Sequence, residues 1–263
     1  MKKIKVTAVS YLNTKPLLYG LFKSKLAPML DLKLDIPSVC AARLRDGDAQ
    51  LGLVPVAILP ELQKPRIISD FCIGANGAVQ TVSIYSRVPL EQVERIYLDY
   101  HSRTSVELTR ILLREYWQLS PELVPADTGY ETRIQGKDAG LIIGDRAIAM
   151  AGDYPYDYDL AEAWLDHTGL PFVFAAWVST RPLDPEFLHE FNEALKMGIA
   201  AIPELIYLLP TPASGFDLEK YYTRHISYAL DEPKKQALNL FLNKIAPGKK
   251  SPLSFDAPAL SLP

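Results

Sequence analysis

The stretch IKVTAVSYLNTKPLLYGLFKSK at 4–25 sets the architecture of this chain. Its first six residues form an apolar strand, and a helix-like pattern follows over Lys15–Lys25. Asn13 or Thr14 suits the position before that helix, and Pro16 supplies a fixed φ near its start. A strand that passes directly into a helix is typical of an α/β fold with a largely parallel sheet.

The rest of the chain continues this alternation. Strands are expected at 30–36 and 51–55, on either side of a helix that Ser38 caps and that ends at Gly47. A second α/β unit starts near Arg87, with elements expected at 95–99, 106–117, 123–126, 139–143 and 170–179. Helical stretches at 184–201, 217–229 and 233–244 and an irregular tail from 247 to 263 complete the chain.

These last helices have no expected strands of their own, so they must pack on the first unit. The sequence therefore predicts two lobes. The first is discontinuous and combines residues 1–86 with residues 180–263, while the second lobe, 87–179, is inserted between them. Ligands of such folds bind where strands end and helices begin, facing the cleft between the lobes.

Composition excludes several classes of function. The chain has 263 residues, with 28 Lys+Arg against 31 Asp+Glu, and a net charge of −3 offers no footprint for nucleic acid or an anionic membrane. Two cysteines without a C-x-x-C pair favour a reducing compartment. No stretch has the length of a signal-peptide core or a spanning helix, so a cytoplasmic location is expected. Nothing in the sequence indicates an oligomeric state.

Common cofactor motifs are also missing from the sequence. It has no G-x-G-x-x-G after a strand, no phosphate loop, no G-x-S-x-G and no H-E-x-x-H. Asp153, Asp157 and Asp159 lie among tyrosines, but their spacing misses the calcium loop and is more typical of a solvated loop. We therefore expect neither a cofactor nor a metal.

The first candidate site lies at the end of the first strand. Ser10, Tyr11 and Asn13 follow that strand, at the sheet edge where ligands of α/β folds bind. Helix capping by Asn13 or Thr14 explains the same residues without a ligand. Both interpretations stay open on spacing alone.

The second candidate is Ser102-Arg103-Thr104-Ser105, which follows the strand that ends at Asp99. Thr104 and Glu107 have the spacing of a capping box, which explains one of the three hydroxyls. Three hydroxyls, an arginine and the free amides of a helix start together make an anion site. Arg103 has the fork geometry that binds carboxylates. We favour phosphate or carboxylate binding here.

Three further positions are open to two interpretations. Asp145 follows a strand and either caps the next helix or contacts substrate hydroxyls. Ser83 lies on a polar-faced strand near the proposed hinge, and Ser38 caps the second helix; both are candidate substrate contacts, although structural roles are more common there. Trp177 is expected in the core.

Taken together, ordered blocks of the sequence resemble the chorismate dehydratase family of the futalosine route to menaquinone. The resemblance rests on VSYLNTKPL at 9–17, LGLVPVA at 51–57, LDYHSRTSVELTRILL at 98–113, IIGD at 142–145 and TGLPFVFAAW at 168–177. It covers most of residues 4–180. It implies a two-lobed fold like that of type 2 periplasmic binding proteins, in a cytoplasmic enzyme.

The family's reaction converts chorismate to 3-[(1-carboxyvinyl)oxy]benzoate and water, without a cofactor or metal. The resemblance implies that Asn13 is the functional asparagine and that Ser102, Arg103, Thr104 and Ser105 hold the small dicarboxylate substrate. His101 directly precedes that block, and the resemblance assigns it no catalytic role. Since Asp145 is the one obvious carboxylate in these blocks, our hypothesis is that the substrate's own enolpyruvyl carboxylate acts as the base while Asn13 fixes its geometry.

Other functions remain as alternatives at this stage. The sister enzyme 1,4-dihydroxy-6-naphthoate synthase shares the fold, and a histidine in the cleft would favour it. A binding protein that only captures a carboxylate ligand would be favoured by a secretion signal. A detached ligand-sensing domain would be favoured by a DNA-binding helix pair, and the sequence contains no such pair.

Overall fold

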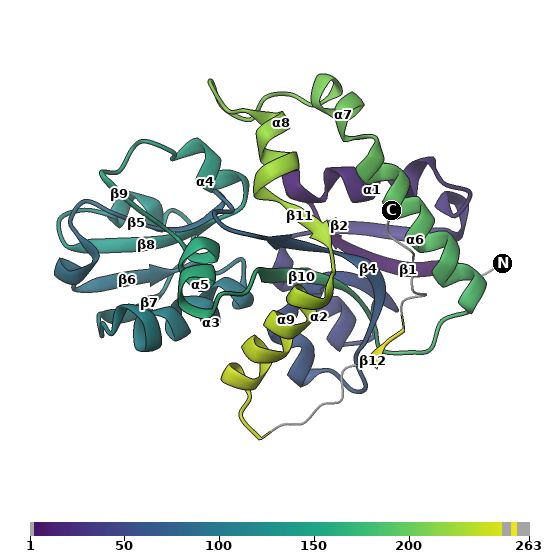
Figure 1. The fold of residues 1–263 in the computed structure, drawn as a ribbon, viewed down its shortest axis with the longest axis horizontal. Coiled ribbons are helices and arrows are strands. Elements are labelled where there is room, and N and C mark those ends of the chain that lie inside the picture. The colour runs from purple at the N-terminus through teal and green to yellow at the C-terminus, as the bar shows by residue number, and fades with distance from the viewer. Residues whose placement is uncertain (1–2, 249–253, 257–263) are drawn as a thin grey trace.

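The computed structural model describes residues 3–248 and 254–256. Two sheets lie end to end along the long axis, each with helices packed against it (Figure 1). The first sheet has the order β11-β4-β10-β3-β1-β2, with β12 also paired to β4. Its strands are β1 (Ile4–Val9), β2 (Leu30–Asp35), β3 (Leu51–Pro55), β4 (Arg66–Ala75), β10 (Phe172–Ser179), β11 (Ser227–Ala229) and β12 (Ser254–Phe255).

The second sheet has the order β7-β6-β8-β5-β9. Its strands are β5 (Val82–Ser86), β6 (Arg95–Leu98), β7 (Glu122–Pro125), β8 (Asp138–Ile143) and β9 (Tyr156–Asp159). Both sheets are mixed. β1 is parallel to β2 and β3, and β6 is parallel to β7 and β8, whereas β10 and β5 run antiparallel to their neighbours. The expected α/β fold class is confirmed.

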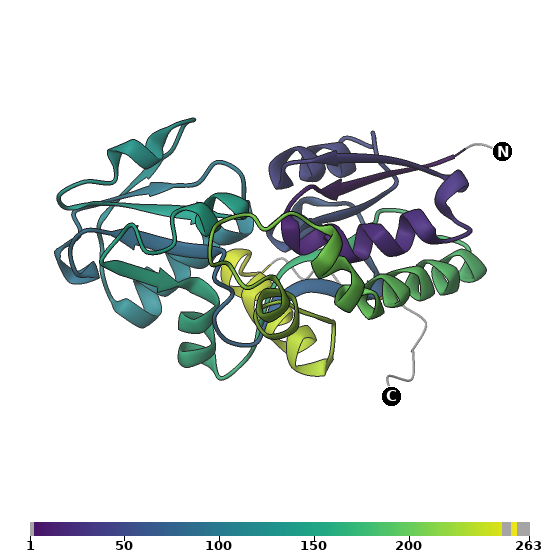
Figure 2. The same cartoon turned by 90° about the horizontal axis from the view of Figure 1, so that it is seen from above.

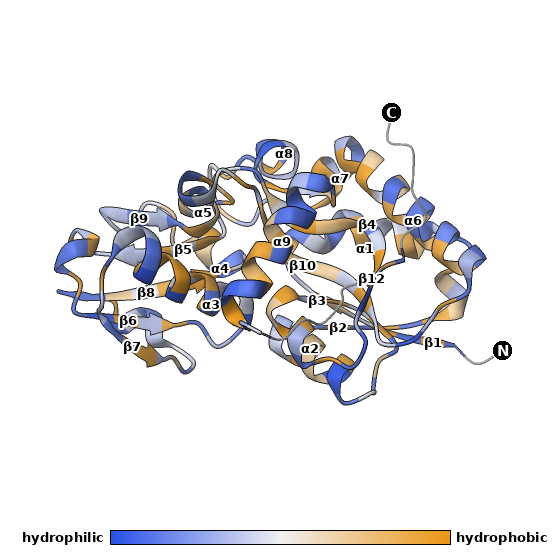
Figure 3. Ribbon diagram, turned by 60° about the horizontal axis from the view of Figure 1, so that its bottom comes forward, coloured by the Kyte–Doolittle hydropathy of each residue, from blue (hydrophilic) through white to orange (hydrophobic). Residues whose placement is uncertain are grey.

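Helices fill both lobes. The first lobe contains α1 (Lys15–Lys23), α2 (Pro37–Arg45), α6 (Pro185–Ala200), α7 (Ile202–Leu208), α8 (Leu218–Lys220) and α9 (Glu232–Ile245). The second contains α3 (Arg103–Leu112), α4 (Asp145–Ala149) and α5 (Leu160–Thr168). Hydrophobic residues concentrate on the strands and on the helix faces turned toward them (Figure 3). Trp177 is fully buried and meets Phe191 edge-on, with 5.0 Å between ring centroids, as expected for a core residue.

Strand pairing fixes where the chain crosses between the lobes. β5 pairs with β8 and β9 in the second sheet, and β10 pairs with β3 and β4 in the first. The crossings therefore lie at 76–81 and 169–171, each one strand earlier than the expected boundaries of 1–86, 87–179 and 180–263. All eight residues of β10 are buried, which fits a central strand that is covered on both faces. The division of the chain into two domains remains a proposal.

The C-terminal segment differs from the helical stretches that the sequence suggested. In place of a helix over 217–229, α8 is followed by a π-helical turn, η7 (Tyr221–His225), and then by β11, which pairs with β4. In the expected irregular tail, β12 forms a short pairing with β4, and residues 249–253 and 257–263 lie outside the described residues. β4 and β9 are also not predicted from the sequence. The sequence of β9 is the polar run YDYD, and the strand lies at the edge of its sheet.

Two expected helix caps were placed wrongly. α2 begins at Pro37, so Ser38 lies inside its first turn, and Ile36 stands at the cap position without a side-chain bond. α3 is capped by Ser102, whose Oγ accepts a hydrogen bond of 3.3 Å from the amide of Ser105. Proline at the first helical position explains the first difference, and the extended backbone of Ser102 explains the second.

α1 and α6 lie side by side and touch through glycine (Figure 2). A Cβ atom on Gly20 would lie 1.9 Å from the carbonyl oxygen of Ala194, and one on Gly198 would lie 2.0 Å from that of Pro16. Only glycine permits this backbone approach. The contact anchors α1, whose first turn follows Asn13, to the longest helix of the first lobe.

Candidate functional site

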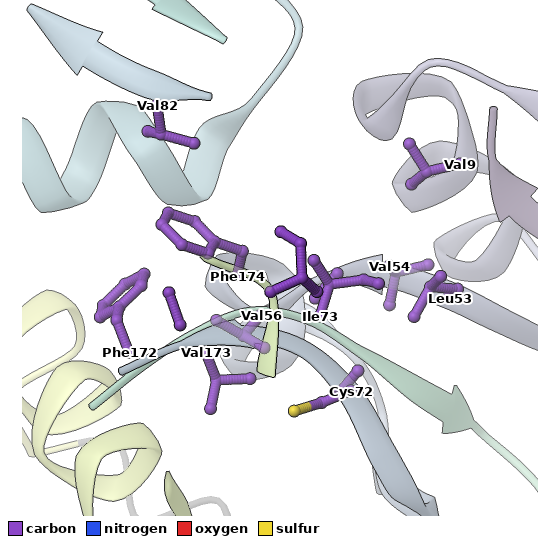
Figure 4. Packing of buried hydrophobic residues seen from close by; sticks show 14 of the residues in the cluster. Val9, Leu53, Val54, Val56, Cys72, Ile73, Val82, Phe172, Val173 and Phe174 are labelled. Carbon is purple, nitrogen blue, oxygen red and sulfur yellow. The ribbon is translucent and has the colours of Figure 1, made fainter. Parts of the chain in front are cut away.

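A pocket opens where the two sheets meet. About 50 Å³ of it can hold the centre of a water molecule, and the volume rises to about 510 Å³ when all the space between atoms, including space that is open to solvent, is counted. Residues from both lobes line it: Val9, Tyr11, Asn13, Thr14, Pro37, Pro55, Ile73, Val79, Thr81, Val82, Ser102, Ser105, Ile143, Gly144, Phe174 and Ala175. Figure 4 shows Val9 and Val82 on either side of Phe174 and Ile73. These four side chains give the pocket an apolar lining from both lobes.

Asn13 lies in a short 3-10 turn, η1 (Leu12–Thr14), between β1 and α1. The amide of Thr14 donates to the carbonyl of Tyr11 at 3.0 Å, which closes the turn. The Thr14 hydroxyl donates to Oδ1 of Asn13 at 3.2 Å. Asn13 therefore lines the pocket from a turn to which these two local bonds contribute.

Tyr11 reaches across the pocket to the second lobe. Its hydroxyl lies 2.6 Å from Nδ1 of His101. Burial raises the pKa of the Tyr11 phenol, while burial and the Arg146 guanidinium lower the pKa of His101. Both rings are therefore uncharged at neutral pH, and the bond joins the lobes without an ionic component.

Gly144 forms the part of the wall that faces Tyr11. Its φ of +67° and ψ of −150° lie in a region that only glycine adopts readily. A Cβ atom at this position would lie 2.8 Å from Cζ of Tyr11. The close approach of the Tyr11 ring and the backbone conformation both require glycine here.

The start of α3 supplies hydroxyls to the pocket. Ser102 and Ser105 both line the pocket, and the Ser105 hydroxyl donates to Oγ of Ser102 at 3.1 Å. The first amides of a helix lack partners within the helix, and the helix dipole makes this end positive. The ten-residue α3 therefore offers hydroxyl and amide donors to a carboxylate.

The two residues between these serines point elsewhere. Arg103 forms a two-point ion pair with Glu61 of the first lobe, at 2.9 and 2.5 Å, and is half exposed. Oγ1 of Thr104 accepts a hydrogen bond of 3.1 Å from the amide of Ala57. Both side chains join the lobes beside the pocket and are not among its lining residues.

Asp145 also forms a hydrogen bond between the lobes. Its Oδ1 accepts a hydrogen bond of 3.0 Å from the amide of Leu12, and it begins α4 without capping it. Burial raises the pKa of the Asp145 carboxyl, and the Leu12 amide opposes that rise. The carboxylate thus contacts the turn that contains Asn13, although it does not line the pocket.

The remaining predicted site residues lie outside the pocket lining. The amide of Ser38 donates to the carbonyl of His101 at 3.1 Å, which is another contact between the lobes. Ser10 is exposed, and its amide bonds to the carbonyl of Asp35. Ser83 is buried in β5, in register with Ile142 and Asp159. Of the predicted set, Tyr11, Asn13, Ser102 and Ser105 meet in one pocket.

A buried ion pair supports the second-lobe wall. Asp99 is 2% exposed and pairs with Arg146 of α4. It also accepts hydrogen bonds from the amide of His101 at 2.7 Å and from the Tyr130 hydroxyl at 2.9 Å. This network ties the loop before α3 to α4, so it fixes both His101 and the start of α4.

Sequence reasoning missed a set of tyrosines from the C-terminal segment. Tyr222 donates to the carbonyl of Leu12 at 2.9 Å, and Tyr228 donates to that of Asn13 at 2.7 Å. Tyr221 lies 3.3 Å from the Thr81 hydroxyl. The available signal was the tyrosine-rich stretch YYTRHISY at 221–228, which has no amphipathic pattern to explain it.

The pocket is electrically neutral in its lining. None of the described residues around it carries a formal charge at neutral pH, so an anion would be held by hydroxyls, amides and the start of α3. Across residues 3–248 and 254–256, no three His, Cys, Asp or Glu side chains group as metal ligands. Over the same ranges, no helix has the length and apolar character needed to cross a membrane.

Comparisons with known proteins agree with this architecture. A family model described as menaquinone biosynthesis matches residues 4–247. A chorismate dehydratase of Thermus thermophilus is 27% identical over 227 residues, covering 78% of this chain and 83% of that protein. A solved structure of an Archaeoglobus fulgidus protein has a TM-score of 0.72 at 18% identity, covering 92% of this chain and 96% of the other.

The description of a second solved structure states its fold. A Candida albicans protein, described as having the generic periplasmic binding protein fold, has a TM-score of 0.60 at 12% identity, covering 92% of this chain and 90% of its own. The two-lobed fold expected from the sequence is therefore confirmed as like that of periplasmic binding proteins. Because the family model spans nearly the whole chain, the protein belongs to the menaquinone biosynthesis family.

Proposed function

We propose that this protein is a chorismate dehydratase, a carbon–oxygen lyase that removes water from chorismate to give 3-[(1-carboxyvinyl)oxy]benzoate. The relative from Thermus thermophilus bears that name, and the family is one of menaquinone biosynthesis. The observation that carries the proposal is the meeting of Asn13 with Ser102 and Ser105 in one pocket between the lobes. The cytoplasmic location remains a prediction.

The pocket offers two kinds of surface to this substrate. Val9, Ile73, Val82 and Phe174 provide an apolar wall for the ring. The start of α3 offers hydroxyls and the positive end of its helix dipole, which suit a carboxylate. In this proposal the ring of the substrate lies against the apolar residues and one of its carboxylates lies at the start of α3.

The reaction needs one proton transfer and one leaving group. The C–H electron pair at the ether-bearing ring carbon becomes the third ring double bond. Hydroxide departs from the neighbouring carbon and, with the released proton, gives water. Because the product ring is aromatic, the enzyme has mainly to orient the substrate and assist these two events.

The base in this proposal is the substrate's own enolpyruvyl carboxylate. No ionised side chain is among the described pocket lining, and the carboxylate of Asp145 is already bonded to the Leu12 amide. The Asn13 amide group holds the substrate carboxylate against the C–H bond that breaks. Fixing two reacting groups of one molecule in this way lowers the entropic part of the barrier.

The sister reaction, 1,4-dihydroxy-6-naphthoate synthesis, is the second candidate because a histidine lies beside the pocket. Nδ1 of His101 is 2.6 Å from the Tyr11 hydroxyl, and burial lowers the pKa of the ring. We therefore assign His101 to holding Tyr11. Replacement of His101 by Ala should reduce chorismate turnover by less than tenfold; complete loss in a folded variant would instead indicate a catalytic histidine.

The test is direct. Purified protein is incubated with chorismate, and proton NMR follows the ring and vinyl signals against a protein-free control. We expect new aromatic protons while both vinyl protons of the enolpyruvyl ether persist. Folded protein that yields no aromatic product would remove the proposed function, and binding of chorismate without turnover would favour a carboxylate-binding protein.

A further inference from the structure

The C-terminal segment from α8 to β11 lies near the middle of the molecule, where the lobes meet (Figure 1). Three of its tyrosines, Tyr221, Tyr222 and Tyr228, are 1%, 1% and 6% exposed. Two of them donate hydrogen bonds to the turn before α1, more than 200 residues earlier in the chain. Nothing in the proposed chemistry requires these tyrosines to touch substrate, since none lines the pocket.

The two bonds bracket Asn13. Tyr222 holds the carbonyl of Leu12, which belongs to the peptide group on the N-terminal side of Asn13, at 2.9 Å. Tyr228 holds the carbonyl of Asn13 itself, on the C-terminal side, at 2.7 Å. Peptide groups are planar, so holding both of them restrains φ and ψ of Asn13 and the direction of its Cα–Cβ bond.

A π-helical turn places the neighbouring tyrosines. In η7 the amide of Ile226 bonds to the carbonyl of Tyr221 at 3.0 Å, five residues back. The wider turn buries Tyr221 and Tyr222 together, with Tyr221 facing Thr81 and the Asn13 side chain. Burial raises the pKa of each of the three phenols, so all remain protonated donors at neutral pH.

We infer that Tyr222 and Tyr228 are positioning residues that set the geometry of Asn13 for the reaction, an inference that rests on the proposed chorismate dehydratase activity. They belong to the same lobe as Asn13, so their bonds do not depend on contact with the second lobe. The turn is therefore organised before substrate arrives. The C-terminal segment is part of the active-site framework.

The first test compares Tyr222→Phe and Tyr228→Phe with Tyr158→Phe. The control removes a phenol hydroxyl that bonds to the Leu90 amide at 2.8 Å in the second lobe, away from the pocket. We expect kcat for chorismate to fall about tenfold in each test variant, with KM changed less than threefold and urea midpoints like that of the control. Wild-type kcat in both test variants, or losses that match the unfolded fraction, would overturn the inference.

A double-mutant cycle separates positioning from general structure. If Tyr228 acts through Asn13, the Tyr228→Phe change should cost about tenfold in the wild-type background and nothing further in Asn13→Ala. The same holds for Tyr222→Phe. An equal loss in both backgrounds would mean that the tyrosine acts independently of Asn13, which contradicts the inference.

A readout without turnover distinguishes this inference from the proposed function. The chain has five asparagines, so selective 15N-asparagine labelling gives a simple spectrum in which Asn13→Ala assigns the Asn13 signals. Both test variants should shift the Asn13 amide signals, and Tyr158→Phe should leave them unchanged. Unmoved Asn13 signals would refute positioning, whereas shifted signals in a protein that is inert toward chorismate would sustain positioning and refute the function.

Discussion

The carboxylate of Asp145 in the second lobe accepts a hydrogen bond of 3.0 Å from the backbone amide of Leu12 in the first lobe. Leu12 directly precedes Asn13, and the carbonyls of both residues are held by tyrosines. The Asn13 turn is thus held by hydrogen bonds from its own lobe to two carbonyls and by one hydrogen bond from its Leu12 amide to the opposite lobe. The position of Asn13 is therefore coupled to contact between the lobes.

This relationship predicts different outcomes for two changes at Asp145. Asp145→Asn keeps an oxygen that accepts from the Leu12 amide, so kcat should stay within about threefold of the wild type. Asp145→Ala leaves that amide without its partner, and kcat should fall about tenfold. Steady-state kinetics with chorismate checks both. An asparagine variant as inactive as the alanine variant would mean that the carboxylate itself is the base.

Ser102 and Arg103 are expected to differ in their effects on substrate binding. Ser102→Ala removes a pocket hydroxyl, so KM should rise about tenfold, with about 1 kcal/mol of stability lost with the cap. Arg103→Ala breaks a half-exposed pair with Glu61, and KM should change less than twofold. Kinetic and urea measurements on both variants check this. A large rise in KM for Arg103→Ala would place its guanidinium on the substrate.

The glycine contact between α1 and α6 predicts a large loss of stability. Gly198→Ala puts a Cβ atom 2.0 Å from the Pro16 carbonyl oxygen, which should cost about 3 kcal/mol or more, because two backbones must separate. Gly47→Ala is the control: its φ is +80°, but it has open space, so it should cost about 1 kcal/mol. Equal urea midpoints for the two variants would show that the helices tolerate separation.

The pH dependence of stability is expected to contain a contribution from Asp159. Burial raises the pKa of Asp159 to about 6, against four backbone amide bonds that lower it. The folded state therefore binds this proton more tightly than the unfolded state. The stabilisation is complete below the ordinary carboxyl pKa near 4 and is lost as pH rises through about 6.

Asp159→Asn removes this titration. The free energy of unfolding of the variant, relative to the wild type, should increase between pH 4 and pH 7 by at most about 3 kcal/mol, an upper bound because the side chain is partly exposed. Urea unfolding at four pH values measures it. A difference that is constant with pH, or that decreases, would contradict the raised pKa.

Local sequence signals located the candidate site but did not orient its residues. The strand-to-helix passage at 4–25 and the hydroxyl cluster at 102–105 both lie where a strand ends, so their place in the pocket was predictable. Ser102 and Ser105 are three positions apart, so helical periodicity puts them on one face of the helix and the two residues between them on other faces. Glu61, which pairs with Arg103, comes from the other lobe, so the local sequence gives no signal of the pair.

A local sequence pattern could not predict the contacts of Tyr222 and Tyr228, for a physical reason. Tyr222 and Tyr228 contact residues 210 and 215 positions earlier, and the segment that carries them is held in the fold by the pairing of β11 with β4. β11 has three residues, too few for an alternating pattern to identify it as a strand. Short segments of this kind take their structure from tertiary contacts.

The central claim is that Asn13, held in its turn, orients chorismate for loss of water. It is tested most directly by measuring turnover and binding of chorismate by Asn13→Ala beside the wild type, with Asn239→Ala on the exposed face of α9 as the control. We expect kcat to fall at least a hundredfold in Asn13→Ala, with the dissociation constant changed less than tenfold and the control unaffected. A folded Asn13→Ala variant that turns over chorismate within tenfold of the wild-type rate would contradict the account.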